Sequence, residues 1–154
     1  MPIIEDPMAV AGRRGTVYPA EHADGMAGRY KRPLTEALAL TQFGVNLTTL
    51  DPGAKSALRH WHANEDEFIY VVEGEITLVT NEGERVLTAS MAAGFPSGAP
   101  NGHHLINKSP HPATYLEIGT RAKDEDVDYP DIDMIGIRRD GRYSFQRRNG
   151  QEYK

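Results

Sequence analysis

The 154-residue sequence contains no cysteine. This absence excludes disulfide bonds, cysteine nucleophiles, iron–sulfur clusters and thiolate zinc sites together. Any bound metal ion must therefore be held by histidine, carboxylate or backbone oxygen. Histidine itself is scarce, at six residues, and four of the six fall in two clusters, His60/His62 and His103/His104. This uneven distribution is the feature of the composition that most needs an explanation.

Long apolar segments are also missing. No stretch approaches the roughly 20 apolar residues that would span a bilayer, and the first residues contain no apolar run of signal-peptide length. We therefore expect a cytoplasmic protein with no membrane partner. The absence of cysteine is consistent with a reducing compartment.

The sequence has no excess of positive charge. Its 22 acidic and 17 basic side chains give a formal net charge of -5, which is unfavourable for binding a polyanion, so we expect no nucleic-acid partner. The charge is unevenly spread, because six acidic residues lie in 124–133 and a mainly basic segment follows in 138–154. We expect these two blocks to pair with each other or with a second subunit.

The length favours one domain. Residues 1–33 are rich in glycine, proline and charge, which indicates an extended arm or edge strand, and the spacing of Leu34 and Leu38 predicts one or two helical turns. From Gln42 onward, short β-like runs separated by turn residues indicate an all-β protein. The expected strands cover 43–50, 56–62, 67–72, 76–80, 85–88, 103–107 and 113–118.

The histidine clusters have a spacing that suits a shared site. His60 and His62 are two residues apart, so on a strand both imidazoles would point to the same face. Glu67 begins the next expected strand and can turn its carboxylate toward the same interior. Much later in the chain, alternation places His103 on one face of its strand and His104 on the other. A His-x-His pair alone is more often two packing or solvent-facing side chains than a metal site.

Three neutral imidazoles and one carboxylate form a suitable site for one divalent transition metal ion, such as zinc, iron, manganese, nickel or cobalt. Four protein ligands on an ion that prefers six would leave two positions open. Water, a bidentate small molecule or dioxygen could occupy them. Such an ion can act as a Lewis acid or lower the pKa of bound water.

Two stretches of the sequence have the spacing of known motifs. The first reads His60-x-His62-x4-Glu67-x6-Gly74 after Gly53, and the second reads Pro96-x-Gly98, then four residues, then His103-x3-Asn107. They resemble the two cupin motifs, with one extra residue after Gly53 and two extra residues after Gly98. The resemblance covers about residues 43–120 and is to small single-domain bacterial cupins.

This resemblance implies an antiparallel double-stranded β-helix, a jelly-roll-like barrel whose motif residues point inward. By the same resemblance His60, His62, Glu67 and His103 are the metal ligands, with His104 as the main alternative to His103. We expect an N-terminal arm that packs on the barrel (1–42), the barrel itself (43–120) and a C-terminal extension (121–154). The resemblance also implies a homodimer.

The function implied is that of a metal-dependent enzyme acting on a small oxygen-rich or carboxylated molecule bound in the barrel. A dioxygenase, an isomerase and a lyase all fit, because the cupin fold carries many reactions. The alternative is a non-catalytic cupin that binds or senses a small ligand. Residues 1–42 contain no paired amphipathic helices, which disfavours a stand-alone transcription regulator. Beyond the ligands, the sequence identifies no acid–base residue.

Overall fold

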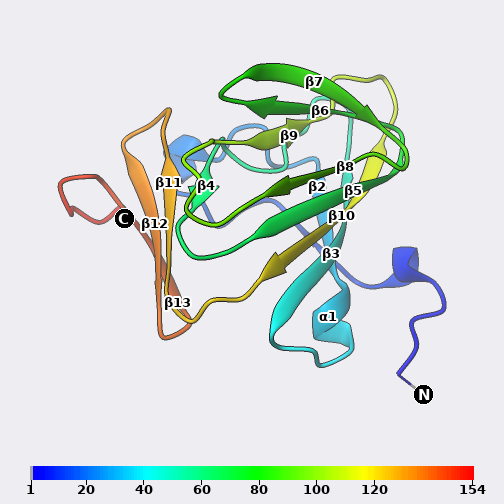
Figure 1. Cartoon of the computed structure of the whole chain (residues 1–154), viewed down its shortest axis with the longest axis horizontal. Coiled ribbons are helices and arrows are strands. Elements are labelled where there is room, and N and C mark those ends of the chain that lie inside the picture. The colour runs from blue at the N-terminus through cyan, green and yellow to red at the C-terminus, as the bar shows by residue number, and fades with distance from the viewer. Residues whose placement is uncertain (1) are drawn as a thin grey trace.

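The computed structural model describes residues 2–154 as antiparallel β-sheets with very little helix (Figure 1). The strands in chain order are β1 (Arg13–Arg14), β2 (Arg29–Pro33), β3 (Phe43–Leu50), β4 (Trp61–His62), β5 (Glu67–Glu73), β6 (Glu75–Thr80), β7 (Gly83–Thr88), β8 (Ala92–Phe95), β9 (His104–Ile106), β10 (Ala113–Thr120), β11 (Glu125–Tyr129), β12 (Met134–Arg139) and β13 (Arg142–Gln146). The helical elements are α1 (Leu34–Ala37) and two 3₁₀ turns (Pro7–Ala9 and Ala20–His22). Within residues 2–154, no helix has the length and hydropathy needed to cross a membrane.

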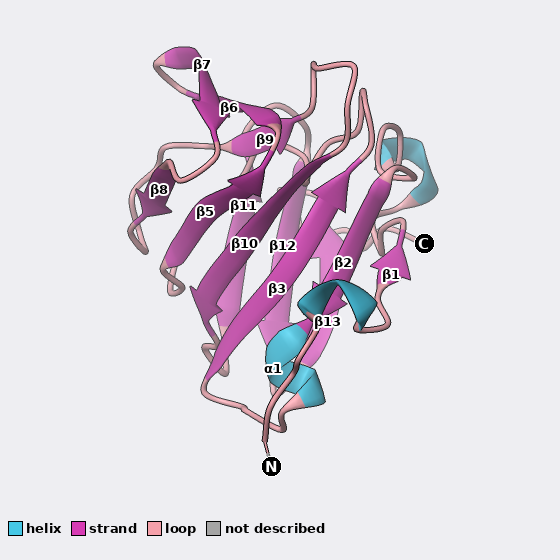
Figure 2. Ribbon diagram, turned by 90° about the vertical axis from the view of Figure 1, so that its right-hand side faces the viewer, coloured by secondary structure: helices cyan, strands magenta, loops and turns pink. Residues whose placement is uncertain are grey.

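The strands form three sheets. The largest has the order β1-β2-β3-β10-β5-β8, a second has the order β13-β12-β11-β4, and a third has the order β7-β6-β9. Neighbouring strands are antiparallel, and β3 pairs with β10 along its whole length. Figure 2 shows β11, β12 and β13 behind β2, β3 and β10, so the six-stranded and four-stranded sheets face each other. The predicted all-β antiparallel barrel is confirmed.

Strand alternation explains how the main core forms. On β5, Ile69 and Val71 are buried, whereas Phe68, Tyr70 and Val72 between and beside them are exposed on the outer face. This period of two is the pattern of a strand that buries one face. The core lies between the six-stranded and three-stranded sheets, and its buried members are Leu50, Ala54, Ile69, Val71, Ile76, Leu87, Leu105, Ala113 and Tyr115.

A second, smaller core belongs to the four-stranded sheet. Val127, Tyr129 and Met134 are buried there, and Tyr18 and Phe145 pack against them with ring centroids 5.6 Å apart. Between the two cores, the sheets form a chamber whose lining mixes polar and charged side chains with apolar and aromatic ones.

The structure differs from the sequence expectation in residues 56–62. Only Trp61–His62 forms a strand, because the preceding backbone crosses from one sheet to another. Lys55 bridges to Ile106 of β9, whereas Trp61 and His62 pair with β11. Residues 56–62 therefore have the composition of a strand, but they pair with no single neighbour along their length.

Two further segments contribute more strand than the sequence indicated. Residues 29–33 form β2, which pairs with β3, so the glycine-rich N-terminal region supplies an edge of the largest sheet. Residues 121–154 contain β11, β12 and β13. Their charged outer positions hide a strand pattern in which Val127 and Tyr129 alternate as buried residues.

The charge blocks of this C-terminal segment pair within the chain. Arg139 contacts Asp126 at 2.7 Å, and Arg148 contacts Asp128 at 3.0 Å. The mutual pairing expected from the sequence is thus present. Because most of these groups are solvent-exposed, each pair adds little to stability.

The turn between β5 and β6 depends on Gly74. Its φ is +85°, and an added Cβ would lie 2.9 Å from the Pro112 carbonyl oxygen. Gly53 has a similar φ of +84° but has no atom within 4 Å of the position that an added Cβ would take.

We expect Gly53→Ala to cost about 1–2 kcal/mol of folding free energy through backbone strain. Gly74→Ala should cost about 1–3 kcal/mol more through overpacking. Denaturant unfolding of both variants measures the difference, and equal losses would contradict it.

Candidate functional site

His60 and His103 are placed opposite each other by the backbone. The His60 amide donates to the His103 carbonyl at 3.1 Å, and the His103 amide donates to the His60 carbonyl at 2.9 Å. This reciprocal pair fixes the two residues as direct cross-strand neighbours. Their ring centroids are 4.8 Å apart. Phe95 stacks on the outer side of the His103 ring at a centroid distance of 3.6 Å, so this imidazole is held in place.

His62 and Glu67 come from different sheets. His62 ends β4 and pairs with Val127 of β11, so the C-terminal segment positions it. Glu67 begins β5 and pairs with Gly119 of β10 and with Phe95 of β8. The cluster therefore forms where the six-stranded and four-stranded sheets approach each other.

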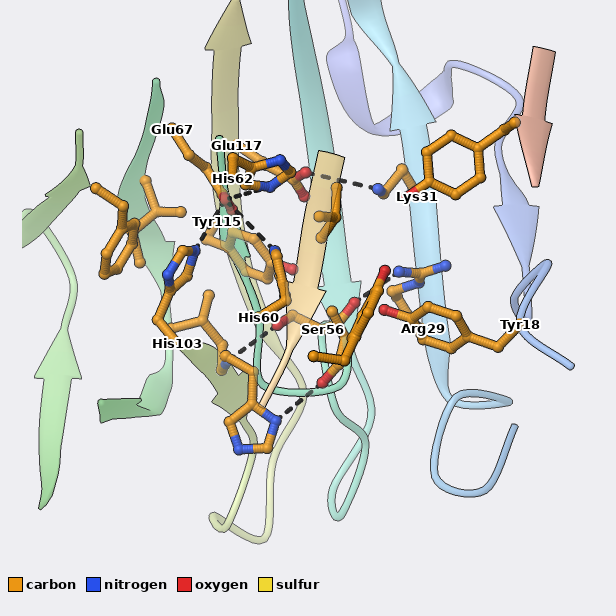
Figure 3. Close-up of a pocket in the computed structure, with 18 residues that line it drawn as sticks. Tyr18, Arg29, Lys31, Ser56, His60, His62, Glu67, His103, Tyr115 and Glu117 are labelled. Atoms are coloured by element: carbon orange, nitrogen blue, oxygen red, sulfur yellow. Dashed lines mark hydrogen bonds and ion pairs between the residues drawn. The ribbon is translucent and has the colours of Figure 1, made fainter. Parts of the chain in front are cut away.

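The four residues converge on one carboxylate oxygen (Figure 3). Glu67 Oε2 lies 2.9 Å from His103 Nε2, 3.2 Å from His62 Nε2 and 3.7 Å from His60 Nε2. The ligand atoms of His60, His62 and Glu67 all lie within 4.8 Å of one another, which is a group that could hold a metal ion. The residues singled out from the sequence are thus brought together.

Hydrogen bonds at the far side of two rings orient their lone pairs toward this cluster. His60 Nδ1 lies 2.7 Å from the Leu58 carbonyl oxygen, and His103 Nδ1 lies 3.3 Å from the Asn101 carbonyl oxygen. A carbonyl can only accept, so Nδ1 carries the proton in each neutral ring and Nε2 presents its lone pair, as metal binding requires. Without a metal ion, a hydrogen bond from Nε2 to Glu67 requires the ring to be doubly protonated. The neutral arrangement is typical of histidines that bind metals. The donors fit a divalent transition metal ion.

His62 is oriented by carboxylates instead. Its Nδ1 atom is buried without a hydrogen-bond partner among residues 2–154 and lies 3.8 Å from both Glu65 Oε1 and Glu125 Oε2. Glu125 is completely buried, and its Oε1 accepts from the amides of Asn64 and Asp126 at 2.9 and 2.8 Å. Two negative groups beside Nδ1 favour a proton there, which leaves Nε2 for the cluster.

Burial and charge shift the pKa values of the cluster in different directions. Burial alone raises the pKa of Glu67, but hydrogen bonds from His103, His60 and His62 outweigh it and hold this pKa well below the usual 4.5. Burial lowers the pKa of His60. Burial also disfavours charge on His62, yet Glu67, Glu125 and Glu65 together raise its pKa above 6.5. Without a metal ion, the carboxylate is ionised and His62 carries a proton more readily than His60.

The cluster occupies one side of a chamber of about 170 Å³ between the sheets. The wall provided by β2 and β10 carries Arg29, Lys31 and Glu117, and Lys31 Nζ lies 3.6 Å from Glu117 Oε1. Tyr18, Tyr129 and Tyr143 close the chamber from the N-terminal segment and the four-stranded sheet. Burial raises the pKa of Tyr143 to about 12, so its hydroxyl stays protonated.

Sequence reasoning missed this second wall. The signal was present on the strand expected at 113–118, where alternation places Glu117 on the same face as Tyr115. His104, the alternative ligand, also lines the chamber, but its Nδ1 lies 2.9 Å from the Ala57 carbonyl oxygen. It makes no contact with Glu67 within hydrogen-bond distance, unlike His103.

Comparison with known proteins agrees with this fold. A family model for the cupin domain matches residues 46–119. A crystal structure of a sugar phosphate isomerase from a cupin superfamily, from Silicibacter pomeroyi, is 41% identical to the chain, with a TM-score of 0.93 over 99% of this chain and 97% of that chain. The chain belongs to the cupin superfamily.

Other structures resemble this cupin more distantly. A candidate sugar phosphate isomerase from Acidithiobacillus ferrooxidans is 28% identical, with a TM-score of 0.73 over 77% of this chain and 76% of that chain. A polyketide cyclase from Streptomyces resistomycificus, at 17% identity and a TM-score of 0.63 over 77% of this chain and 78% of that chain, shares the fold. No curated protein matches the sequence.

The proton on His62 in the metal-free cupin depends on Glu67. We expect Glu67→Gln to lower the pKa of His62, because burial of the ring is then opposed only by the more distant carboxylates. An NMR titration of the metal-free protein measures this pKa. Glu36→Gln is the control, since that exposed carboxylate pairs with Arg13 away from the site. An unchanged His62 pKa in Glu67→Gln would contradict the electrostatic account.

Proposed function

We propose that this cupin is a divalent-metal-dependent isomerase that acts on a small sugar phosphate. The observation that carries the proposal is that one chamber is lined both by the Glu117–Lys31 pair and by the histidine–carboxylate cluster. The 41% identity over nearly the whole chain to a protein described as a sugar phosphate isomerase supports the same choice.

His60, His62, Glu67 and His103 would hold the metal ion. Zinc, iron, manganese and nickel all accept imidazole nitrogen and carboxylate oxygen. When bound, such an ion would polarise the carbonyl and hydroxyl oxygens of the substrate and stabilise the negative charge that develops on them. The remaining chemistry is that of side chains in the chamber.

Glu117 is the proposed acid–base group. Interconversion of an aldose and a ketose takes a proton from one carbon and returns it to the neighbouring carbon, with no net oxidation and no water consumed. Glu117 is a carboxylate in the chamber that no histidine of the cluster contacts within 4 Å, so it is available to accept and return this proton. Lys31 offsets its charge.

The lining of the chamber also suits this reaction. Tyr18, Tyr129 and Tyr143 line it on the side of the four-stranded sheet. Exclusion of water strengthens the electrostatic interactions inside and limits loss of the transferred proton to solvent. A dioxygenase or a lyase would use the same metal ligands, but the placement of Glu117 favours proton transfer between carbons. A non-catalytic sensor would bind the sugar phosphate without converting it.

The proposed ligand set predicts which histidines retain the metal. His60→Ala and His103→Ala should each remove one imidazole donor and strip the ion from the purified protein. His104→Ala is the matched control and should keep it, because His104 bonds to Ala57 instead of Glu67. Elemental analysis of protein purified without added metal or chelator measures the content. Stoichiometric metal in His60→Ala or His103→Ala would contradict the assignment.

The role of Glu117 predicts a separate effect on turnover. Glu117→Gln should lower kcat by about 10²–10⁴, the usual contribution of a general base, and leave the metal content unchanged. Glu84→Gln is the matched control, since Glu84 also pairs with a lysine, Lys108, but outside the chamber. Assays of aldose–ketose interconversion measure kcat for both variants. An unchanged kcat in Glu117→Gln would place the base elsewhere.

The homodimer and the cytoplasmic location also remain predictions. Phe43, Phe68, Tyr70 and Val72 are exposed, and the last three of them lie side by side on the outer face of β5. A second copy of the chain would cover this apolar surface.

A further inference from the structure

Arg29 brings into the chamber a positive charge that forms no ion pair with a carboxylate of residues 2–154. Its Nη1 donates to the Ser56 carbonyl at 2.6 Å and its Nη2 donates to the Gly15 carbonyl at 2.7 Å. Both acceptors are neutral. The Nε atom is buried without a hydrogen-bond partner in the described part of the chain. A buried guanidinium with an unused donor is costly unless an anion completes its environment.

Lys31 lies on the same face of the same strand. Arg29 and Lys31 are two residues apart on β2 and both line the chamber. The 3.6 Å distance from Lys31 Nζ to Glu117 exceeds that of a hydrogen bond, so the three ammonium donors remain available. Across the sheet, Lys31 is level with Thr48 and then with Tyr115, whose hydroxyl is buried without a partner among residues 2–154.

These groups stand across the chamber from the histidines. Figure 3 shows Arg29 and Lys31 on one side, and His60, His62 and His103 on the other with Tyr115 among them. A ligand that reaches both sides would place one end at the metal ligands and the other end at the two basic groups.

The charge of the chamber indicates what that other end is. With a divalent ion in place, the ion, Arg29 and Lys31 outweigh the lining carboxylates Glu67 and Glu117 by about two positive charges, and the buried Glu125 behind His62 reduces this excess to about one. A phosphate monoester carries about 1.5–2 negative charges near pH 7. A neutral sugar would leave this excess unbalanced, whereas a sugar phosphate would neutralise it.

We infer that Arg29 and Lys31 bind the phosphate group of the substrate, with its carbonyl end toward His60, His62 and His103. This inference rests on the proposed isomerase function for the nature of the substrate. It adds the orientation of the molecule and the residues that discriminate a phosphorylated sugar from a neutral one. Arginine and lysine are the side chains that proteins use most for phosphate.

Arg121 offers a rival position. It lines a neighbouring cavity of about 240 Å³ that shares His62, Glu67 and Glu117 with the chamber. It is exposed and forms no ion pair in the described part of the chain. A surface arginine close to the site is therefore a matched control for a general loss of positive charge.

The test measures binding by calorimetry in the metal-loaded full-length protein. The probes are arabinitol 5-phosphate, which has no carbonyl and cannot isomerise, and arabinitol, which lacks the phosphate. The wild-type protein should bind the phosphate ester at least about tenfold more tightly than the neutral polyol. Arg29→Gln and Lys31→Gln should each weaken binding of the phosphate ester by at least about tenfold, the loss expected for a charged hydrogen bond, and leave arabinitol binding unchanged.

Arg121→Gln should change neither affinity. Loss of the phosphate preference in Arg121→Gln, with Arg29→Gln and Lys31→Gln unaffected, would overturn the inference, as would equal binding of the two probes by the wild type. Arg29 also donates to two loop carbonyls, so thermal unfolding of each variant checks that the fold is intact. If Arg29→Gln unfolds, the phosphate affinity of Lys31→Gln alone tests the inference.

Turnover of sugar phosphates, measured separately, distinguishes this inference from the proposed function. The expected binding pattern without any turnover would overturn the isomerase proposal and leave the phosphate position standing. Turnover with a KM that neither Arg29→Gln nor Lys31→Gln changes would overturn the phosphate position and leave the isomerase proposal standing.

Discussion

The buried carboxylate of Glu67 is the interaction on which the rest of the site depends. An ionised carboxylate loses most of its hydration in this interior, and the penalty is several kcal/mol unless other groups replace the water. Here three imidazole nitrogens within 3.7 Å of one oxygen replace it. The same convergence that stabilises the charge also creates a set of donors for a cation. The metal-site geometry is thus inseparable from the requirement to solvate one buried acid.

The supporting contacts divide between backbone and side chain. His60 and His103 are held by reciprocal amide–carbonyl bonds and by carbonyls at Nδ1. His62 instead depends on β11 for its position and on Glu65 and Glu125 for its orientation. A backbone carbonyl accepts a hydrogen bond but carries no net charge, whereas an ionised carboxylate also contributes a negative charge. These carboxylates are therefore among the groups that raise the pKa of His62.

Much of this site could be predicted from the sequence. The His60-x-His62 alternation, the position of Glu67 at the start of a strand and the spacing to His103 are local patterns, and local patterns survive without knowledge of the fold. The strands 43–50 and 113–118 were also evident from their apolar content. Lys31 and Glu117 could not be paired in advance, because their proximity arises from the pairing of β2 with β3 and of β3 with β10.

The C-terminal strands were hidden for a different reason. Residues 125–129 contain three acids, and their charge obscured the alternation of Val127 and Tyr129. An extended arm or edge strand was expected within residues 1–33, and residues 29–33 do form β2. Val127 and Tyr129 line the chamber, so the buried face of β11 was present in the sequence but was masked by the acids beside it.

The pairing of β4 with β11 also sets the order in which the protein can mature. His62 acquires its partner strand only when residues 125–129 have been synthesised, after more than half of the chain has emerged. The earlier strands can fold as a sheet before that moment, but the chamber has no second wall and the histidine no fixed orientation. A cation that binds only the finished geometry would therefore be acquired late in biogenesis, after docking of the last sheet.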